Sequence, residues 1–217
     1  MYETVLENIS EIPFVFIRGV KLNADSLQNA DMMRGEETEF IGLMESASEE
    51  GMYVLPGSHS KLIHVDKSGK IVNFTTMLTG EMIAALSGNT ILKDAVDLTV
   101  SETDEDYLIK GYDYSSENGI NEALFKVLIL KNMFNCNPVQ IYSFFMGIVL
   151  CDEIKKITKS DIDKIIIGGR SQIKNATAIL LKHASDKNIT VIDDNAVSDC
   201  VTKGMIKIFE YKDMCNL

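Results

Sequence analysis

The 217-residue sequence has few of the residues that build disulfide frameworks, metal centres or membrane spans. It contains only three histidines, and their spacing matches no metal-ligand pattern, so we expect no metal site made by the protein alone. It has no run of 18 apolar residues, which excludes a spanning helix of ordinary length. The four cysteines form no C-x-x-C pair, which is typical of reduced thiols in a cytoplasmic protein: Cys136, Cys151, Cys200 and Cys215.

Basic residues are also scarce relative to acidic ones. The 21 lysines and arginines face 32 aspartates and glutamates, which gives a formal net charge of −11. This balance argues against nucleic acid or an anionic membrane as the main partner, because both attract clustered lysine and arginine. The N-terminus has neither the basic start nor the apolar core of a signal peptide, so we expect a cytoplasmic location. Any anionic ligand must be held by backbone donors and a few well-placed cations.

Apolar periodicity and turn residues predict a mixed α/β chain. An apolar run at 12–17 predicts a strand, and a helix is expected between Gly35 and Gly51. Thr79 stands at the expected N-cap of a short helix. The polar, acidic segment 94–118 is interpreted as a solvated loop. The other expected elements are strands at 52–55, 61–66 and 70–75, helices at 119–135 and 138–157, a strand ending at Gly168, a helix at 171–185, a strand at 188–193 and a helix at 196–209.

The order of these elements predicts the fold class. Three strands in a meander are followed by a helix, then helical insertions, then two βα units. This order describes one lobe of the actin/hexokinase-like ATPase architecture, an α/β fold. A flavodoxin-like or Rossmann sheet would alternate strands and helices from its start, and the meander argues against it.

The segment "LPGSHSK" lies in the first turn of the meander. Gly57 permits a close backbone approach, Ser58 and Ser60 supply hydroxyl donors, and Lys61 adds a positive charge. Successive small residues in a tight turn leave N–H groups free to form an anion-binding concavity. An ordinary hairpin turn is the alternative. His59 is suited either to donate to a phosphate oxygen or to cap the turn.

The segment "IIIGGR" is a strand that meets a Gly-Gly turn at the start of a helix. Bare backbone at Gly168 and Gly169 would let a flat adenine approach, with the helix N-terminus facing the nucleotide. A plain tight turn between strand and helix is the alternative.

The segment "MRGEET" concentrates polar residues at a helix start. Acidic side chains in a first helical turn are stabilised by the helix dipole, so N-terminal capping is one interpretation. The other is that Glu36 works as a general base that orients a substrate hydroxyl for phosphoryl transfer. Arg34 would then meet a substrate carboxylate in a two-point contact.

Four segments together resemble the 2-dehydro-3-deoxygalactonokinase family of sugar-acid kinases: "DMMRGEET", "LPGSHSK", "TTMLTGE" and "CDEI…IIIGGR". The resemblance implies transfer of the ATP γ-phosphate, with magnesium, to the 6-hydroxyl of 2-dehydro-3-deoxygalactonate in galactonate catabolism. It implies Glu36 as the base and Arg34 and Glu37 as substrate-binding residues. The implied phosphate-binding residues are Gly57, Ser58, His59, Ser60, Lys61, Thr79 and Gly80, and the implied adenosine-binding residues are Gly168, Gly169 and Arg170.

The sequence departs from the family pattern in having no Asp-x-Gly-Thr phosphate hairpin. We therefore expect residues 1–50 to be the end of an N-terminal lobe, and 51–217 to be a C-terminal lobe with a helical insertion at about 94–157. The strand at 12–17 would lack its sheet neighbours, and an exposed apolar edge invites pairing with another chain. This predicts a homo-oligomer or a separately encoded N-terminal half. The alternative function is a non-catalytic remnant that binds a nucleotide or a sugar acid.

Overall fold

The computed structural model describes residues 2–6, 9–22, 25–44, 49–169 and 172–215. The chain forms two compact units, one of residues 50–194 and one of residues 1–49 together with 195–217. Residues 195–217 thus group with the N-terminal segment. The assignment of residues 1–50 to the end of an N-terminal lobe stays a prediction.

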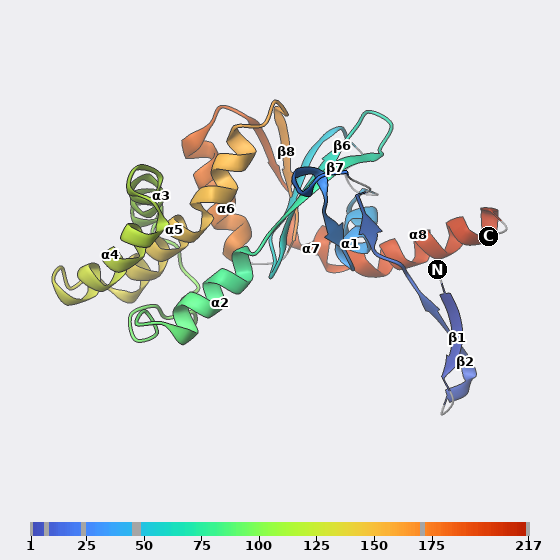
Figure 1. Ribbon diagram of the computed structural model, residues 1–217, viewed down its shortest axis with the longest axis horizontal. Helices are drawn as coiled ribbons and strands as arrows, with labels where there is room; N and C mark the ends of the chain where they lie inside the picture. Colours follow the sequence, from blue (N-terminus) through green and yellow to red (C-terminus); the bar gives the residue numbers. More distant parts are fainter. Residues whose placement is uncertain (1, 7–8, 23–24, 45–48, 170–171, 216–217) are drawn as a thin grey trace. The chain divides into compact units, whose positions relative to one another are not determined.

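A five-stranded sheet forms the centre of the unit 50–194, with strand order β7-β6-β5-β8-β9 (Figure 1). The first three strands pair antiparallel, which confirms the predicted meander. Strand β5 also pairs parallel with β8, and β8 pairs parallel with β9. The strands are β5 (Gly51–Leu55), β6 (Ser60–Val65), β7 (Ile71–Met77), β8 (Lys164–Ile167) and β9 (Asn188–Val191).

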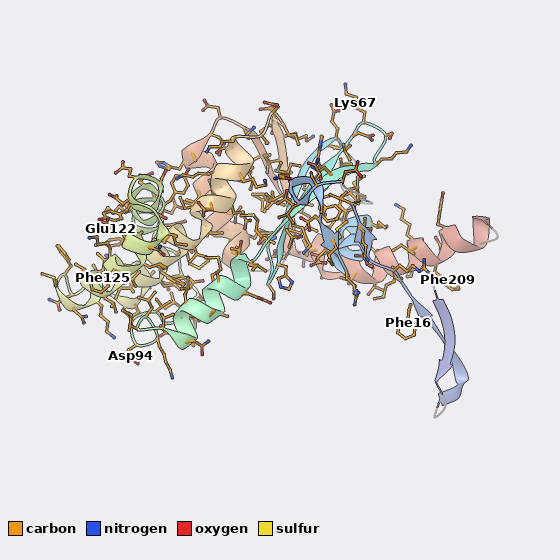
Figure 2. All side chains as sticks on the ribbon, in the orientation of Figure 1. Phe16, Lys67, Asp94, Glu122, Phe125 and Phe209 are labelled. Carbon is orange, nitrogen blue, oxygen red and sulfur yellow. The ribbon has the colours of Figure 1, made fainter. Side chains whose placement is uncertain are left out.

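Five helices accompany this sheet within the described part of the unit: α2 (Thr79–Asn89), α3 (Glu105–Asn118), α4 (Ile120–Asn132), α5 (Pro138–Thr158) and α6 (Gln172–Ala184). Helix α5 is central, because it packs against α2, α3, α4 and α6. One hydrophobic core joins it to the sheet through residues such as Val54, Ile165 and Phe145. Helix α4 lies at the outside, where Glu122 and Phe125 point away from the core (Figure 2).

The prediction of a loop at 94–118 is wrong for its second half, which forms α3. The helix starts at Asp104, whose side chain accepts a hydrogen bond from the Tyr107 N–H at 3.0 Å. Its buried face consists of Leu108, Gly111, Tyr112 and Ser115. These positions have helical spacing, but two of the four are small and weakly apolar, so the periodicity carries little hydrophobic signal.

Glycines let α3 and α5 pack backbone to backbone. A Cβ atom added at Gly147 of α5 would overlap the carbonyl oxygen of Leu108 and lie 2.7 Å from the Tyr112 nitrogen. A Cβ atom at Gly111 of α3 would overlap the Phe144 carbonyl oxygen. The two helices therefore approach as closely as their backbones allow, and this contact anchors the helical insertion to the core.

The second unit contains two short antiparallel ribbons and a helix pair. Its elements are β1 (Tyr2–Leu6), β2 (Ile9–Phe16), β3 (Val20–Lys21), η1 (Leu27–Asn29), β4 (Met32–Met33), α1 (Glu36–Leu43), α7 (Asp194–Ser198) and α8 (Cys200–Cys215). Helices α1 and α8 pack closely, because Gly42 meets the Cys200 backbone and Gly204 meets the Thr38 backbone.

Two sequence expectations are corrected in this unit. The strand expected at 12–17 does have a neighbour, since β2 pairs antiparallel with β1 over registers such as Glu3 with Val15. The helix expected at 196–209 is two helices, α7 and α8. Among the described residues, no helix combines the length and apolar character needed to cross a bilayer.

The close packing of α3 on α5 yields a first prediction. Gly147→Ala should lower the free energy of unfolding by about 2 kcal/mol or more, because the added methyl group meets backbone atoms that cannot rotate away. The matched control is Gly88→Ala on α2, where an added Cβ has nothing within 4 Å. That change should be neutral or stabilising by up to about 1 kcal/mol. Urea unfolding followed by circular dichroism measures both, and equal stabilities would contradict the packing described.

Candidate nucleotide-binding site

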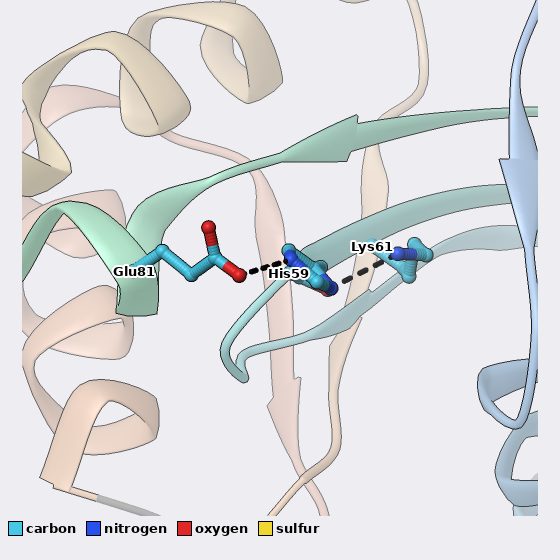
Figure 3. Close-up of polar contacts among 3 residues, drawn as sticks. All are labelled: His59, Lys61 and Glu81. Atoms are coloured by element: carbon cyan, nitrogen blue, oxygen red, sulfur yellow. Dashed lines mark hydrogen bonds and ion pairs between the residues drawn. The ribbon is translucent and has the colours of Figure 1, made fainter.

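The turn between β5 and β6 is a short loop with an exposed tip and a buried base. Ser58 and His59 are exposed and Gly57 is half-buried, whereas Ser60 and Lys61 are buried at the start of β6. The Lys61 ammonium donates to the His59 carbonyl oxygen at 3.4 Å, back toward the loop itself (Figure 3). The tip can therefore meet a ligand while Ser60 and Lys61 support it from below.

The N-terminus of α2 clamps this loop. The Glu81 N–H donates to the Ser58 carbonyl oxygen at 3.2 Å. Gly80 allows the approach, because a Cβ atom there would lie 2.5 Å from the Gly57 oxygen and 2.7 Å from the Ser58 Cα. The structure thus brings together the predicted phosphate-binding residues of the loop with Thr79 and Gly80.

His59 makes a contact that neither sequence interpretation foresaw. Its Nε2 atom lies 2.8 Å from Glu81 Oε1, and both side chains are substantially exposed (Figure 3). Glu81 was not among the predicted site residues, although a carboxylate in a first helical turn beside a small-residue loop was a signal for it. The pair ties the loop tip to α2 by side chains as well as by backbone.

The Gly-Gly turn after β8 lies directly beside the loop. The Gly168 N–H donates to the Val54 carbonyl oxygen at 2.9 Å, which continues the parallel pairing of β8 with β5. Gly169 is buried with φ +77°, and a Cβ atom there would lie 3.0 Å from the Pro56 carbonyl oxygen. Arg170 lies outside the described residues. Ligands of open α/β sheets bind at the carboxyl ends of strands, and both loops occupy such ends.

A buried acid lies beneath the same loop, and the sequence prediction missed it. Glu153 on α5 is 1% exposed, and one of its oxygens accepts a hydrogen bond from the Thr79 hydroxyl group. Burial raises the pKa of Glu153 above its ordinary value, while the hydroxyl groups of Thr79 and Ser60 lower that pKa to a smaller extent. Ser60 Oγ and Glu153 Oε1 are both buried, and neither makes a hydrogen bond of normal distance and angle in the described part of the chain.

The "MRGEET" residues belong to the other compact unit, at the start of α1. Glu36 Oε2 accepts from the Arg34 N–H at 3.0 Å, and Glu37 Oε2 accepts from the Gly35 N–H at 2.7 Å. Both carboxylates therefore make the local contacts that the capping interpretation expects, and Gly35 supplies the φ of +107° at the N-cap. The general-base role of Glu36 stays a prediction.

Arg34 and Glu37 line a cavity of about 770 Å³ in that unit. Its remaining walls are largely apolar and include Phe16 and Phe209, which Figure 2 labels. Across the described residues, no group of three or more histidine, cysteine, aspartate or glutamate side chains could hold a metal ion.

The buried acid yields a prediction for stability against pH. Because the pKa of Glu153 is raised in the folded state, the folded protein keeps a proton that the unfolded chain releases above pH 4.5. Wild-type stability should therefore fall relative to Glu153→Gln as pH rises from about 4.5 to the raised pKa, by at most about 1.4 kcal/mol per pH unit. Urea unfolding of both proteins between pH 5 and 8 measures this difference. A difference that stays constant with pH would contradict the raised pKa.

Comparison with known proteins places this chain in a family. Residues 2–208 match the 2-keto-3-deoxy-galactonokinase family. The 2-dehydro-3-deoxygalactonokinase of Escherichia coli (strain K12) is 29% identical over 131 residues, which cover 58% of this chain and 42% of that enzyme. The chain therefore spans less than half the length of this relative.

Solved structures agree on the fold. A crystal structure from Sinorhizobium meliloti, whose protein carries the 2-dehydro-3-deoxygalactonokinase name, superposes with a TM-score of 0.76 at 20% identity, covering 95% of this chain and 69% of that one. The activator of the 2-hydroxyisocaproyl-CoA dehydratase from Clostridium difficile, with bound ADPNP, gives a TM-score of 0.52 at 12% identity, with 83% of this chain and 69% of the other covered. These neighbours confirm the predicted actin/hexokinase-like α/β fold. On the match over residues 2–208, the chain belongs to the 2-keto-3-deoxy-galactonokinase family.

Proposed function

We propose that the protein is a sugar-acid kinase that transfers the ATP γ-phosphate to the 6-hydroxyl of 2-dehydro-3-deoxygalactonate in the cytoplasm. The observation that carries the proposal is the adjacency of the loop Gly57–Lys61, the α2 N-terminus and the Gly-Gly turn at one end of the sheet. Family membership supports the substrate class, because the matched E. coli protein is named for this sugar acid.

The residues of the unit 50–194 fit a nucleotide. A Cβ atom added at Gly57 would meet nothing within 4 Å, so the loop tip has free space in front of its backbone. Helix α2 has 11 residues, and its first turn adds N–H donors and the positive end of a helix dipole to the same place. We assign the phosphates to Gly57, Ser58 and His59 with Thr79 and Gly80, and the adenosine to Gly168, Gly169 and Arg170. Ser60 and Lys61 then hold the loop from its buried side.

Bound ATP supplies the phosphoryl group, and magnesium bound to its phosphates supplies positive charge. No cage for magnesium exists among the described residues. Magnesium is usually bound by substrate phosphates and water together with one or two carboxylates. In the other unit, Glu36 would accept the proton of the 6-hydroxyl, and Arg34 with Glu37 would orient the substrate.

A second function has a specific observation in its favour. The sequence has no Asp-x-Gly-Thr phosphate hairpin. Lobe closure in kinases of this fold completes the phosphate contacts and excludes water. The alternative is a protein that binds a nucleotide or a sugar acid and turns over only with a separate N-terminal half or as a homo-oligomer.

Nucleotide binding at the Gly-Gly turn is tested by Gly169→Ala. The methyl group would press against the Pro56 carbonyl oxygen and strain a φ of +77°, so ATP affinity should fall about tenfold, equal to about 1.4 kcal/mol. Gly119→Ala is the matched control, because Gly119 has φ +81° with nothing within 4 Å of an added Cβ. Both changes strain a positive φ, which should cost about 1–2 kcal/mol of stability, and Gly169→Ala adds the contact with Pro56. Titration calorimetry should show weaker ATP binding for Gly169→Ala than for Gly119→Ala. Equal affinities of the two variants would count against this adenosine site.

Turnover is tested by coupled ADP release with Mg-ATP and 2-dehydro-3-deoxygalactonate, with the gluconate epimer as the substrate control. Glu36→Gln should lower kcat by at least about 100-fold, because a positioned general base contributes that much or more. Glu39→Gln, in the same first turn of α1, should keep most of the activity. Equal rates for the two variants would contradict the base assignment. ATP binding without turnover in the wild type would favour the second function.

A further inference from the structure

A buried acid, Glu153, touches Thr79 of the proposed phosphate site and Ser60, which supports the loop of that site, yet the proposed transfer gives it no role. It is 1% exposed in the C-terminal half of α5, a helix whose buried face is mostly apolar. Its partners come from two other elements, Thr79 at the start of α2 and Ser60 at the start of β6. Carboxylates are seldom fully buried unless hydrogen bonds or ion pairs offset the cost of their desolvation.

We propose that Glu153 is the positioning residue of the phosphate-binding loop. It holds the hydroxyl groups of Thr79 and Ser60, and so keeps the loop and the α2 N-terminus in a fixed position relative to each other. This inference rests on the proposed function, because it assigns a support to the phosphate site named there. Glu153 itself is too deeply buried to touch a nucleotide, so it acts through the two residues that it holds.

The contacts around the loop show what Glu153 adds. The tip is already tied to α2 by the Glu81 N–H with the Ser58 oxygen and by the pair His59–Glu81. Both of these links lie on the exposed side. Glu153 supplies the link on the buried side, and it connects the site to α5, 74 residues further along the chain. Loop and helix are thus held at two sides, which resists rotation of one against the other.

Burial favours the neutral form of this carboxyl group over the ionised form. Two fully buried oxygens, Ser60 Oγ and Glu153 Oε1, make no hydrogen bond of normal distance and angle within the described residues. A hydrogen bond between Glu153 Oε1 and Ser60 Oγ would satisfy both oxygens, while Oε2 continues to accept from Thr79. An ionised carboxylate beneath the loop would also repel the phosphates proposed above it. Of the side chains that contact the loop, the Lys61 ammonium offsets such a charge and the Glu81 carboxylate, which meets His59, adds to it.

Two substitutions of Glu153 separate its hydrogen bonds from its volume. Glu153→Gln keeps one acceptor and one donor in place, so it should bind ATP within about threefold of the wild type. Glu153→Met fills a similar volume without hydrogen bonds, and apolar replacements of buried charged groups commonly preserve folding. ATP affinity should then fall about tenfold, whereas adenosine affinity should stay unchanged, because the partners of Glu153 are Ser60 of the loop and Thr79 at the α2 start. Asp152→Asn, an exposed neighbour on α5, is the matched control.

Two measurements on the full chain decide the inference. Calorimetry with ATP and with adenosine gives the ratio of affinities, which a merely structural loss of stability would not change. Amide hydrogen exchange without nucleotide should be faster at residues 57–61 in Glu153→Met, but not in Glu153→Gln or Asp152→Asn. Unchanged exchange and an unchanged affinity ratio in Glu153→Met would overturn the inference, and so would a Gln variant as impaired as the Met variant. A wild type that binds no ATP would overturn the proposed function instead, and loop exchange would still decide the role of Glu153.

Discussion

The parallel pairing of β5 with β8 is the constraint on which the candidate site depends. It joins strands that are more than 100 residues apart in the chain, and it places the loop after β5 beside the Gly-Gly turn after β8. The pairing is possible because β8 is a short strand whose three isoleucines, at 165–167, are buried between β5 and β9. Helix α5 packs into the same core, so the insertion between the strands stabilises the pairing.

The sequence was sufficient to predict the sheet and most helices of this unit, because their signals are local. The turns at 56–59 and 66–69 separate apolar strands, and Pro138 marks the start of α5, where Asn137 and Gln140 form a capping box. Helix α3 was missed because its buried face includes Gly111 and Ser115, whose value lies in letting α5 approach. That benefit depends on the partner helix, so it is invisible in a single segment.

The site shows the same division between local and long-range information. The loop Gly57–Lys61 and the Gly-Gly turn were identifiable from turn chemistry, but their adjacency follows from the sheet. Thr79 was expected to be an N-cap. In the structure Leu78 takes that place, while the Thr79 hydroxyl group turns to Glu153. Glu153 was unpredictable, because the sequence "GIVLCDEI" does not reveal which of its two acids, Asp152 or Glu153, faces the core. Only the packing of α5 against α2 reveals its partners.

The central claim is that the carboxyl ends of β5 and β8, with the α2 N-terminus, form a nucleotide site. The most direct measurement is an ATP titration of the ¹⁵N-labelled protein followed by amide chemical shifts. The account predicts that the largest changes occur at Ser58, Gly80 and Gly169, with small changes on the outer helix α4. Saturable changes confined to other elements, or none at millimolar ATP, would contradict it.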